Sequence, residues 1–275
     1  MKIAPFNASE AFIQDFHDSR PGGTSSALGS LRFQYDDHEW SSTYQLLIRS
    51  VPEMPWGRVL DLACGDGHLL SMLRQHLPES WGLYGLDFSS GELRRALEVS
   101  DNSTHYVQGM AQGLPYADES FDTVLCHMAF MLMENQPEVL KEIARVLKPG
   151  GTFSAIVGGA PSATAIQQCF VNCIRELPRN PDYAEVRFSR SNHDPDRLQT
   201  LIKAEFNEVS ATNLTIPLTL TPEEAWQWFS GMYDLSTRLV EDLNQVRAHF
   251  ISQLEDKVHN HILTFHFFHA VKNGS

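Results

Sequence analysis

Residues 59–70 place a short apolar run, a glycine-containing turn and a second apolar segment in immediate succession. This order predicts a strand, a turn and then a helix. Gly65 and Gly67 in the turn can adopt backbone angles barred to other residues and leave room for a ligand. The helix that follows would offer unpaired N–H groups and a positive dipole end. A plain strand-to-helix turn has the same features, so the pattern alone leaves both interpretations open.

The next apolar run, 83–87, ends in Asp87, which follows Gly67 by 20 residues. In dinucleotide-type folds an acid at this distance binds a ribose hydroxyl. Three further patterns follow in order: Gln-Gly-Leu-Pro-Tyr at 112–116, Ser-Phe-Asp-Thr-Val at 120–124, and Arg-Val-Leu-Lys-Pro-Gly-Gly at 145–151. Together they favour a cofactor site over a plain turn.

Over about residues 55–160 this series of motifs resembles the class I S-adenosylmethionine (SAM)-dependent methyltransferases, in particular their type 11 small-molecule branch. The resemblance implies an α/β fold with a Rossmann-like, seven-stranded, mostly parallel sheet and an antiparallel last strand. It also implies SAM as the cofactor, and it says little about the substrate.

The chain divides into an N-terminal helical cap segment, 1–50, and a SAM-binding domain, 51–275, with cap insertions near 178–205 and 221–258. The second insertion is expected because roughly forty residues separate the last two predicted strands, more than a tight connection needs. Alternating strand and helix patterns predict a parallel sheet with helices on both faces. The predicted strands are 58–62, 82–87, 104–109, 121–127, 152–158, 206–218 and 262–272.

The N-terminal segment contains a short predicted helix around Phe12, a mobile linker at 21–26 and a second helix over 38–48. Trp40 and Tyr44 fall on one face of that second helix. In the resembled family a helix here lies beside the cofactor and helps to close the site. The two aromatic side chains therefore either contact the substrate or only pack on the sheet.

The resemblance places the methionine part of SAM over 63–67, the ribose on Asp87 and the adenine near Met110 and Ala111. A carboxylate suits the ribose because it can accept two hydrogen bonds. Asp61 either reaches the amino group through water or only braces the loop. The cofactor-binding residues implied in this way are Asp61, Ala63, Cys64, Gly65, Gly67, Asp87, Phe88, Met110, Ala111, Gln112 and Cys126.

Two positions depart from the family pattern. Ala63 stands where the family often has glycine, and Met110 stands where an aspartate usually accepts from the adenine amino group. Because methionine is a weak acceptor, either Gln112 substitutes for the aspartate or backbone contacts suffice. Farther along, Ser89 followed by Glu92 predicts a capping box at a helix start.

Catalytic and substrate residues are less defined. His127, at the mouth of the fourth strand, either deprotonates a substrate hydroxyl near neutral pH or only shapes the pocket. The apolar stretch 129–133, which includes Phe130, forms either a substrate wall or core. The predicted helix that begins at Thr221 either roofs the acceptor pocket or only packs; its aromatic residues include Trp226, Phe229 and Tyr233.

Composition excludes some partners. The net charge of −13 repels phosphate backbones, so we expect no nucleic-acid substrate. Four cysteines without a CxxC pair suit a reducing cytoplasm. The first residues lack a signal-peptide core, and no apolar run approaches the ~20 residues that span a bilayer. We therefore expect a cytoplasmic monomer or homodimer, without metal or membrane, that acts on a small-molecule acceptor.

The sequence thus predicts an enzyme that transfers a methyl group to oxygen on a small, partly apolar metabolite. N- or C-methylation, or carboxyl methylation of a carrier-bound acyl chain, are enzymatic alternatives. A third alternative, from another class, is a SAM-binding partner subunit without transfer activity.

Overall fold

The computed structural model describes residues 7–101, 103–255 and 257–274, so the expectation drawn from residues 1–5 lies outside it. Its centre is a seven-stranded sheet with the order β5-β4-β3-β6-β7-β9-β8. All neighbours pair in parallel except β9, which is antiparallel to both β7 and β8. This confirms the predicted fold class. The strands are β3 (Gly57–Leu62), β4 (Trp81–Asp87), β5 (Thr104–Gln108), β6 (Phe121–His127), β7 (Leu147–Gly158), β8 (Asn207–Leu220) and β9 (His259–Val271).

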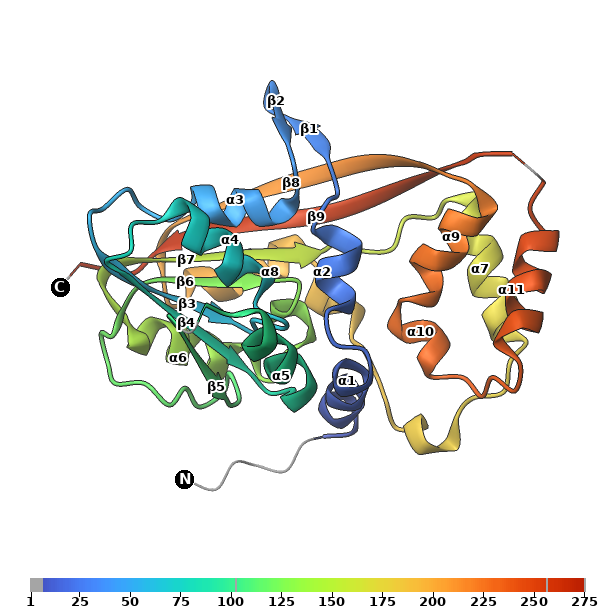
Figure 1. Cartoon of the computed structure of the whole chain (residues 1–275), viewed down its shortest axis with the longest axis horizontal. Helices are drawn as coiled ribbons and strands as arrows, with labels where there is room; N and C mark the ends of the chain where they lie inside the picture. Colours follow the sequence, from blue (N-terminus) through green and yellow to red (C-terminus); the bar gives the residue numbers. More distant parts are fainter. Residues whose placement is uncertain (1–6, 102, 256, 275) are drawn as a thin grey trace.

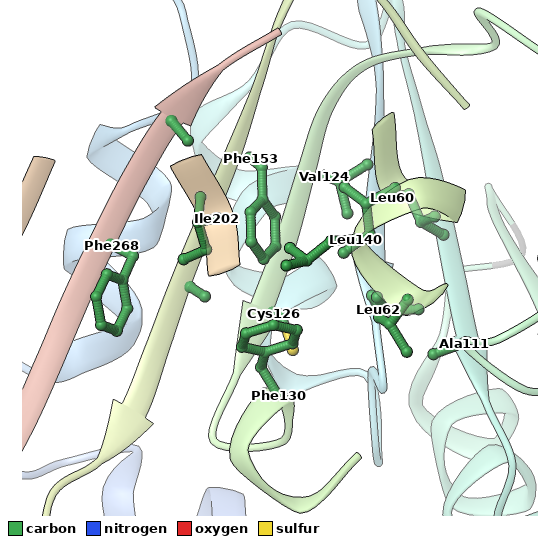
Figure 2. Packing of buried hydrophobic residues seen from close by; sticks show 14 of the residues in the cluster. Leu60, Leu62, Ala111, Val124, Cys126, Phe130, Leu140, Phe153, Ile202 and Phe268 are labelled. Carbon is green, nitrogen blue, oxygen red and sulfur yellow. The ribbon is translucent and has the colours of Figure 1, made fainter. Parts of the chain in front are cut away.

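Helices cover both faces of the sheet (Figure 1). On one face lie α3 (Thr43–Arg49), α4 (His68–His76) and α5 (Ser90–Val99). On the other lie α6 (Gln136–Val146) and α8 (Pro195–Lys203). This double cover explains why β3 and β6 are buried along nearly their whole length, since a parallel sheet buries both of its faces. Figure 2 shows one such core, in which Phe130 and Cys126 lie near Phe153.

A separate cap lies beyond one end of the sheet, where β8 and β9 extend toward it (Figure 1). It consists of α7 (Ala165–Arg175), α9 (Pro222–Ser230), α10 (Tyr233–Ser236) and α11 (Leu243–Ser252), with short 3-10 turns at Pro181–Tyr183 and Arg190–His193 in the chain between α7 and α8. Its helices share their own apolar cluster. By contrast, α8 packs into the sheet core through Leu198 and Ile202, so the expected insertion 178–205 includes a helix of the sheet layer.

The N-terminal segment differs from the prediction at two places. Residues 21–26 are not a linker, because α2 (Gly23–Leu28) begins there. Trp40 is not helical either: it ends β2 (His38–Trp40), which pairs with β1 (Phe33–Tyr35) in a small hairpin, and α3 begins only at Thr43. The predicted first helix is present as α1 (Ala8–Ser19), and Figure 1 shows it between the sheet and the cap.

The starts of α9 and α5 both have capping residues, but only one of them has a complete capping box. Thr221 and Glu224 form a complete capping box at α9, and the helix ends at Ser230, so that Tyr233 lies on α10 and not on the predicted helix. At α5 only half of the expected box exists. Ser89 caps the N–H of Glu92, whereas the Glu92 carboxylate points elsewhere. None of the described helices is both long enough and apolar enough to cross a membrane.

Candidate cofactor and acceptor site

A cavity of about 970 Å³, its open mouth included, lies at the carboxyl ends of β3, β4 and β6. Ligands of open α/β sheets bind at this edge. The N-terminal helix α1 and the cap helix α10 complete its walls. Eleven residues singled out from the sequence line it: Tyr44, Asp61, Ala63, Gly65, Asp87, Phe88, Met110, Ala111, Gln112, His127 and Tyr233.

The other predicted site residues are not part of the cavity lining and lie in packing positions, so their assignment to the site stays a prediction. Cys126 and Phe130 are fully buried in the sheet core, and Cys64 and Trp40 belong to the cluster on the opposite face. Gly67 begins α4 in the left-handed region, and a Cβ there would overlap the Tyr106 hydroxyl. Trp226 and Phe229 pack inside the cap's own cluster. This packing favours the core alternative for α9, and of the three aromatic residues named from the sequence Tyr233, on α10, lines the cavity.

The turn after β3 is held open by its backbone. Ala63 and Gly65 both adopt left-handed angles, with φ of +60° and +53°. An alanine in this region costs about 1–2 kcal/mol, which explains why glycine is common at this position in the resembled family. The Asp87 carboxylate fixes the turn: Oδ2 accepts from the N–H of Gly65 at 2.8 Å, and Oδ1 accepts from the N–H of Ser89 at 2.8 Å. Burial raises the pKa of Asp87, and these two donors offset part of the rise.

Two buried acceptor atoms beside the cavity have no hydrogen-bond partner among the described residues, Oδ1 of Asp61 and Oε1 of Gln112. The amide orientation of Gln112 is set by its nitrogen, which donates to Glu10 Oε1 at 3.1 Å and to the carbonyl of Glu134 at 2.9 Å. An unpaired buried acceptor costs about 1–3 kcal/mol. Both atoms are therefore suited to a ligand that brings hydrogen-bond donors.

The cavity wall is strongly acidic. Its carboxylates come from Glu10, Asp61, Asp66, Asp87 and Glu92, and the described lining contains no lysine or arginine. Burial, followed by the neighbouring Asp87 and Asp66, raises the pKa of Asp61 well above its usual value. A cation bound beside Asp61 would favour its ionised form. The electrostatics thus suit a positively charged ligand.

His127 is enclosed at the end of β6. Its Nε2 lies 2.9 Å from Thr43 Oγ1, and its ring stacks on Tyr44 with centroids 3.6 Å apart. Burial, with a smaller contribution from His68, lowers the pKa of His127 to about 3. The imidazole is therefore neutral at pH 7 and a weak base, while its buried Nδ1 has no partner among the described groups.

A hydrogen-bonded chain that the sequence did not reveal crosses the same cavity. Tyr233 Oη lies 2.9 Å from His17 Nε2, and His17 Nδ1 lies 3.0 Å from Glu92 Oε1. The other Glu92 oxygen accepts from the N–H of Gly22 at 2.8 Å. His17 and Glu92 were missed because each had a local explanation: His17 falls at the end of a short helix, and Glu92 completes a capping-box pattern. The chain joins cap, N-terminal helix and sheet domain.

The fold and the site define a class: a Rossmann-like domain that binds a nucleoside-containing cofactor at the carboxyl edge of its sheet. The profile of the family described as "Methyltransferase domain" matches residues 60–155. The chain is 31% identical to demethylmenaquinone methyltransferase from Bacillus mycoides over 130 residues, which cover 45% of this chain and 54% of that protein. The chain thus spans about half the length of the curated relatives it matches.

Solved structures extend the likeness to nearly the whole fold. Phosphoethanolamine N-methyltransferase 2 from Haemonchus contortus, solved with S-adenosylhomocysteine, has a TM-score of 0.61 at 18% identity and covers 98% of this chain and 61% of that one. The [4+2]-cyclase SpnF has a TM-score of 0.59 at 14% identity, with 100% and 99% covered. These structures show that the fold is shared, while the family match shows that residues 60–155 carry the SAM-dependent methyltransferase domain that the motifs predicted.

The residues present fit the cofactor of this family. SAM has three groups of hydrogen-bond donors: its ammonium, its ribose hydroxyls and its adenine amino group. The cavity offers three matching acceptors, which are the unpartnered Asp61 oxygen, the remaining lone pairs of Asp87 and the unpartnered Gln112 oxygen. Carboxylates also suit the sulfonium, which is a cation. Gln112 thus lies where it can replace the aspartate whose place Met110 takes.

Proposed function

We propose that this protein is a SAM-dependent methyltransferase that acts on a small, planar, partly apolar acceptor bearing a hydroxyl, and that it methylates oxygen. The observation that carries the proposal is the composition of the cavity. Its lining combines acidic groups suited to SAM with the apolar side chains of Ile13, Leu132 and Met133, and it also includes His127 and Tyr233. Ligand pockets of this kind combine apolar walls with a few placed polar groups.

In this proposal the bound SAM supplies a methyl group on a positively charged sulfur, open to in-line displacement. The protein aligns the acceptor and excludes water, and its carboxylates contribute to binding the sulfonium. The unpartnered Nδ1 of His127 gives the acceptor a hydrogen-bonding contact that fixes its orientation. The low pKa of His127 favours this positioning role over a role as general base.

The acidic wall also bears on the alternatives. A carrier-bound carboxylate would meet five acids and no cationic side chain in the described lining, which disfavours carboxyl methylation. C-methylation of a hydroxylated ring is the second candidate, because a curated relative is named a demethylmenaquinone methyltransferase. We further infer a cytoplasmic protein, monomeric or dimeric, that does not bind nucleic acid, in keeping with its net charge of −13.

The test is incubation of the protein with methyl-labelled SAM and a metabolite extract, followed by mass spectrometry. Label on a neutral hydroxylated compound supports O-methylation, and label on a ring carbon supports the second candidate. Label on a carboxylate contradicts the acceptor class. If SAM binds but no label leaves it, the protein is a SAM-binding partner subunit.

A further inference from the structure

The chain Tyr233–His17–Glu92 is placed and polarised as a proton relay. Glu92 is 3% exposed and receives the N–H of Gly22 on one oxygen and His17 Nδ1 on the other. A carboxylate can only accept, so His17 must hold its proton on Nδ1. In the neutral ring Nε2 is then the acceptor, and the Tyr233 hydroxyl donates to it at 2.9 Å.

This polarity leaves the oxygen of Tyr233 as an acceptor toward the cavity. Its hydrogen is directed at His17, and its remaining lone pair is available to a donor in the pocket. Burial raises the pKa of the Tyr233 phenol, so it stays protonated. The residue can then pass a proton on without holding a charge itself. His127, in contrast, is a weak base whose Nε2 already contacts Thr43.

We propose that Tyr233 is the catalytic residue that takes the proton from the acceptor hydroxyl, with His17 as the terminal base and Glu92 as its positioning residue. This proposal rests on the proposed methyl transfer. The acceptor oxygen forms a bond to the methyl carbon as the carbon–sulfur bond breaks, and that electron pair stays on sulfur. The acceptor proton moves to Tyr233, and the Tyr233 proton moves to His17 Nε2.

The location of the relay supports this role. Its three members come from α10, α1 and α5, so the relay is complete only when the cap and the N-terminal helix close on the sheet domain. Phe16 packs against the Tyr233 ring with centroids 4.6 Å apart and holds the phenol over the cavity. Proton transfer would thus be coupled to closure, which also excludes water.

The first test needs no acceptor. The full chain, labelled with ¹⁵N-histidine and saturated with S-adenosylhomocysteine at pH 8.5, is studied by long-range ¹H–¹⁵N NMR, with His17→Gln to assign the signal. We expect His17 as the neutral tautomer protonated on Nδ1, and we expect Tyr233→Phe to shift its Nε2 resonance. A proton on Nε2, in either the neutral or the charged ring, overturns the relay.

The second test uses turnover, with 1,4-naphthalenediol as the acceptor probe. Tyr233→Phe should lower kcat at least about a hundredfold, change the SAM dissociation constant less than twofold, and regain rate as rising pH ionises the probe. Tyr183→Phe is the matched control, because Tyr183 packs against Phe12 in the same aromatic cluster but lines an outer groove. A loss below threefold in Tyr233→Phe overturns the relay while methyl transfer stands. If wild type methylates neither the probe nor any extract component, the proposed function fails, and the NMR result still decides the relay.

Discussion

The carboxyl edge of the sheet and the cap differ in what their buried side chains contact. At the sheet edge, Asp61, Gln112 and His127 line the cavity, and each has a buried polar atom without a partner among the described residues. In the cap, the aromatic rings face one another: Phe170 stacks on Phe229 at 5.2 Å and meets Phe250 edge-on at 5.6 Å. Unpartnered polar atoms occur in the cap as well, at Trp228 and Ser236, but neither residue lines the cavity, whereas those at the sheet edge do.

This difference shows that the presence of bulky residues does not reveal whether a helix covers the acceptor pocket or belongs to a hydrophobic core. A helix rich in aromatic residues, such as α9, can bury its rings by packing against neighbouring helices. A polar atom buried without a partner cannot be satisfied in that way and so indicates a ligand. Tyr233 differs from the residues of α9 in another way, because its hydroxyl joins a hydrogen-bonded chain with His17 and Glu92 beside the cavity. The predictions below separate the two regions, beginning with the largest effect.

Phe229→Ala tests whether the cap core is structural. The ring is 1% exposed among Phe170, Trp226 and His261, and its removal should lower the free energy of unfolding by about 3–5 kcal/mol. Urea unfolding followed by circular dichroism measures this, and SAM affinity by calorimetry should stay within twofold. Trp56→Ala, at a ring 64% exposed, is the control and should change stability little. An altered acceptor KM with unchanged stability would restore the roof interpretation.

Asp87→Ala should have the opposite effect to Phe229→Ala, because it should lower the affinity for SAM. The variant loses the ribose acceptor and leaves the N–H groups of Gly65 and Ser89 without their partner. At about 1–3 kcal/mol per lost partner, we expect SAM to bind about a hundredfold more weakly in calorimetry, an effect of about 3 kcal/mol. Asp87→Asn keeps one carbonyl oxygen, so its affinity for SAM should fall between those of wild type and Asp87→Ala. Wild-type affinity in a folded Asp87→Ala protein would contradict the ribose assignment.

The low pKa of His127 predicts that the free energy of unfolding depends on pH. Its pKa is about 3 in the folded protein and 6.5 in the unfolded chain. Below pH 6.5 the unfolded chain therefore binds a proton that the folded protein does not, and stability is lost as the pH falls toward 3. His127→Gln should remove about 2 kcal/mol of the loss between pH 6 and pH 4. His38→Gln, at an exposed position, is the control. Parallel curves for wild type and His127→Gln would contradict the low pKa.

The sequence predicted the sheet well because each of its parts has a local cause. The strands are apolar runs, the turn needs glycines, and Asp87 ends a strand at a fixed distance. Eight of the cofactor side chains or turn residues that follow from this frame line the cavity, among them Asp61, Gly65 and Gln112. Apolar spacing also found α1, and the capping residues at Thr221 and Glu224 found the start of α9.

The rest of the site depends on contacts between distant segments. His17 meets Glu92 and Tyr233 across 75 and 216 residues of chain, and no spacing rule reaches that far. Glu92 was misassigned because a capping box explains a glutamate at this position equally well. Trp40 was misplaced because four residues of spacing suit a helix, while a hairpin ends there. Tertiary packing decided each case.

The role of Gln112 depends on both the local sequence and contacts between distant segments. The sequence gives it as one of two alternatives for adenine recognition, and its hydrogen bond to Glu10 orients the side chain. If its unpartnered oxygen accepts from the adenine amino group, Gln112→Ala should weaken SAM binding about five- to tenfold, about 1 kcal/mol. The same substitution also loses the contact with Glu10, so affinity alone does not isolate the adenine contact. A double-mutant cycle does: S-adenosylhomocysteine is compared with S-inosylhomocysteine, in which an oxo group replaces the amino group, on wild type and variant. We expect wild type to prefer the adenosyl ligand about tenfold and the variant to lose that preference. Equal discrimination by both proteins would assign adenine recognition to the backbone, which is the other alternative that the methionine at position 110 leaves.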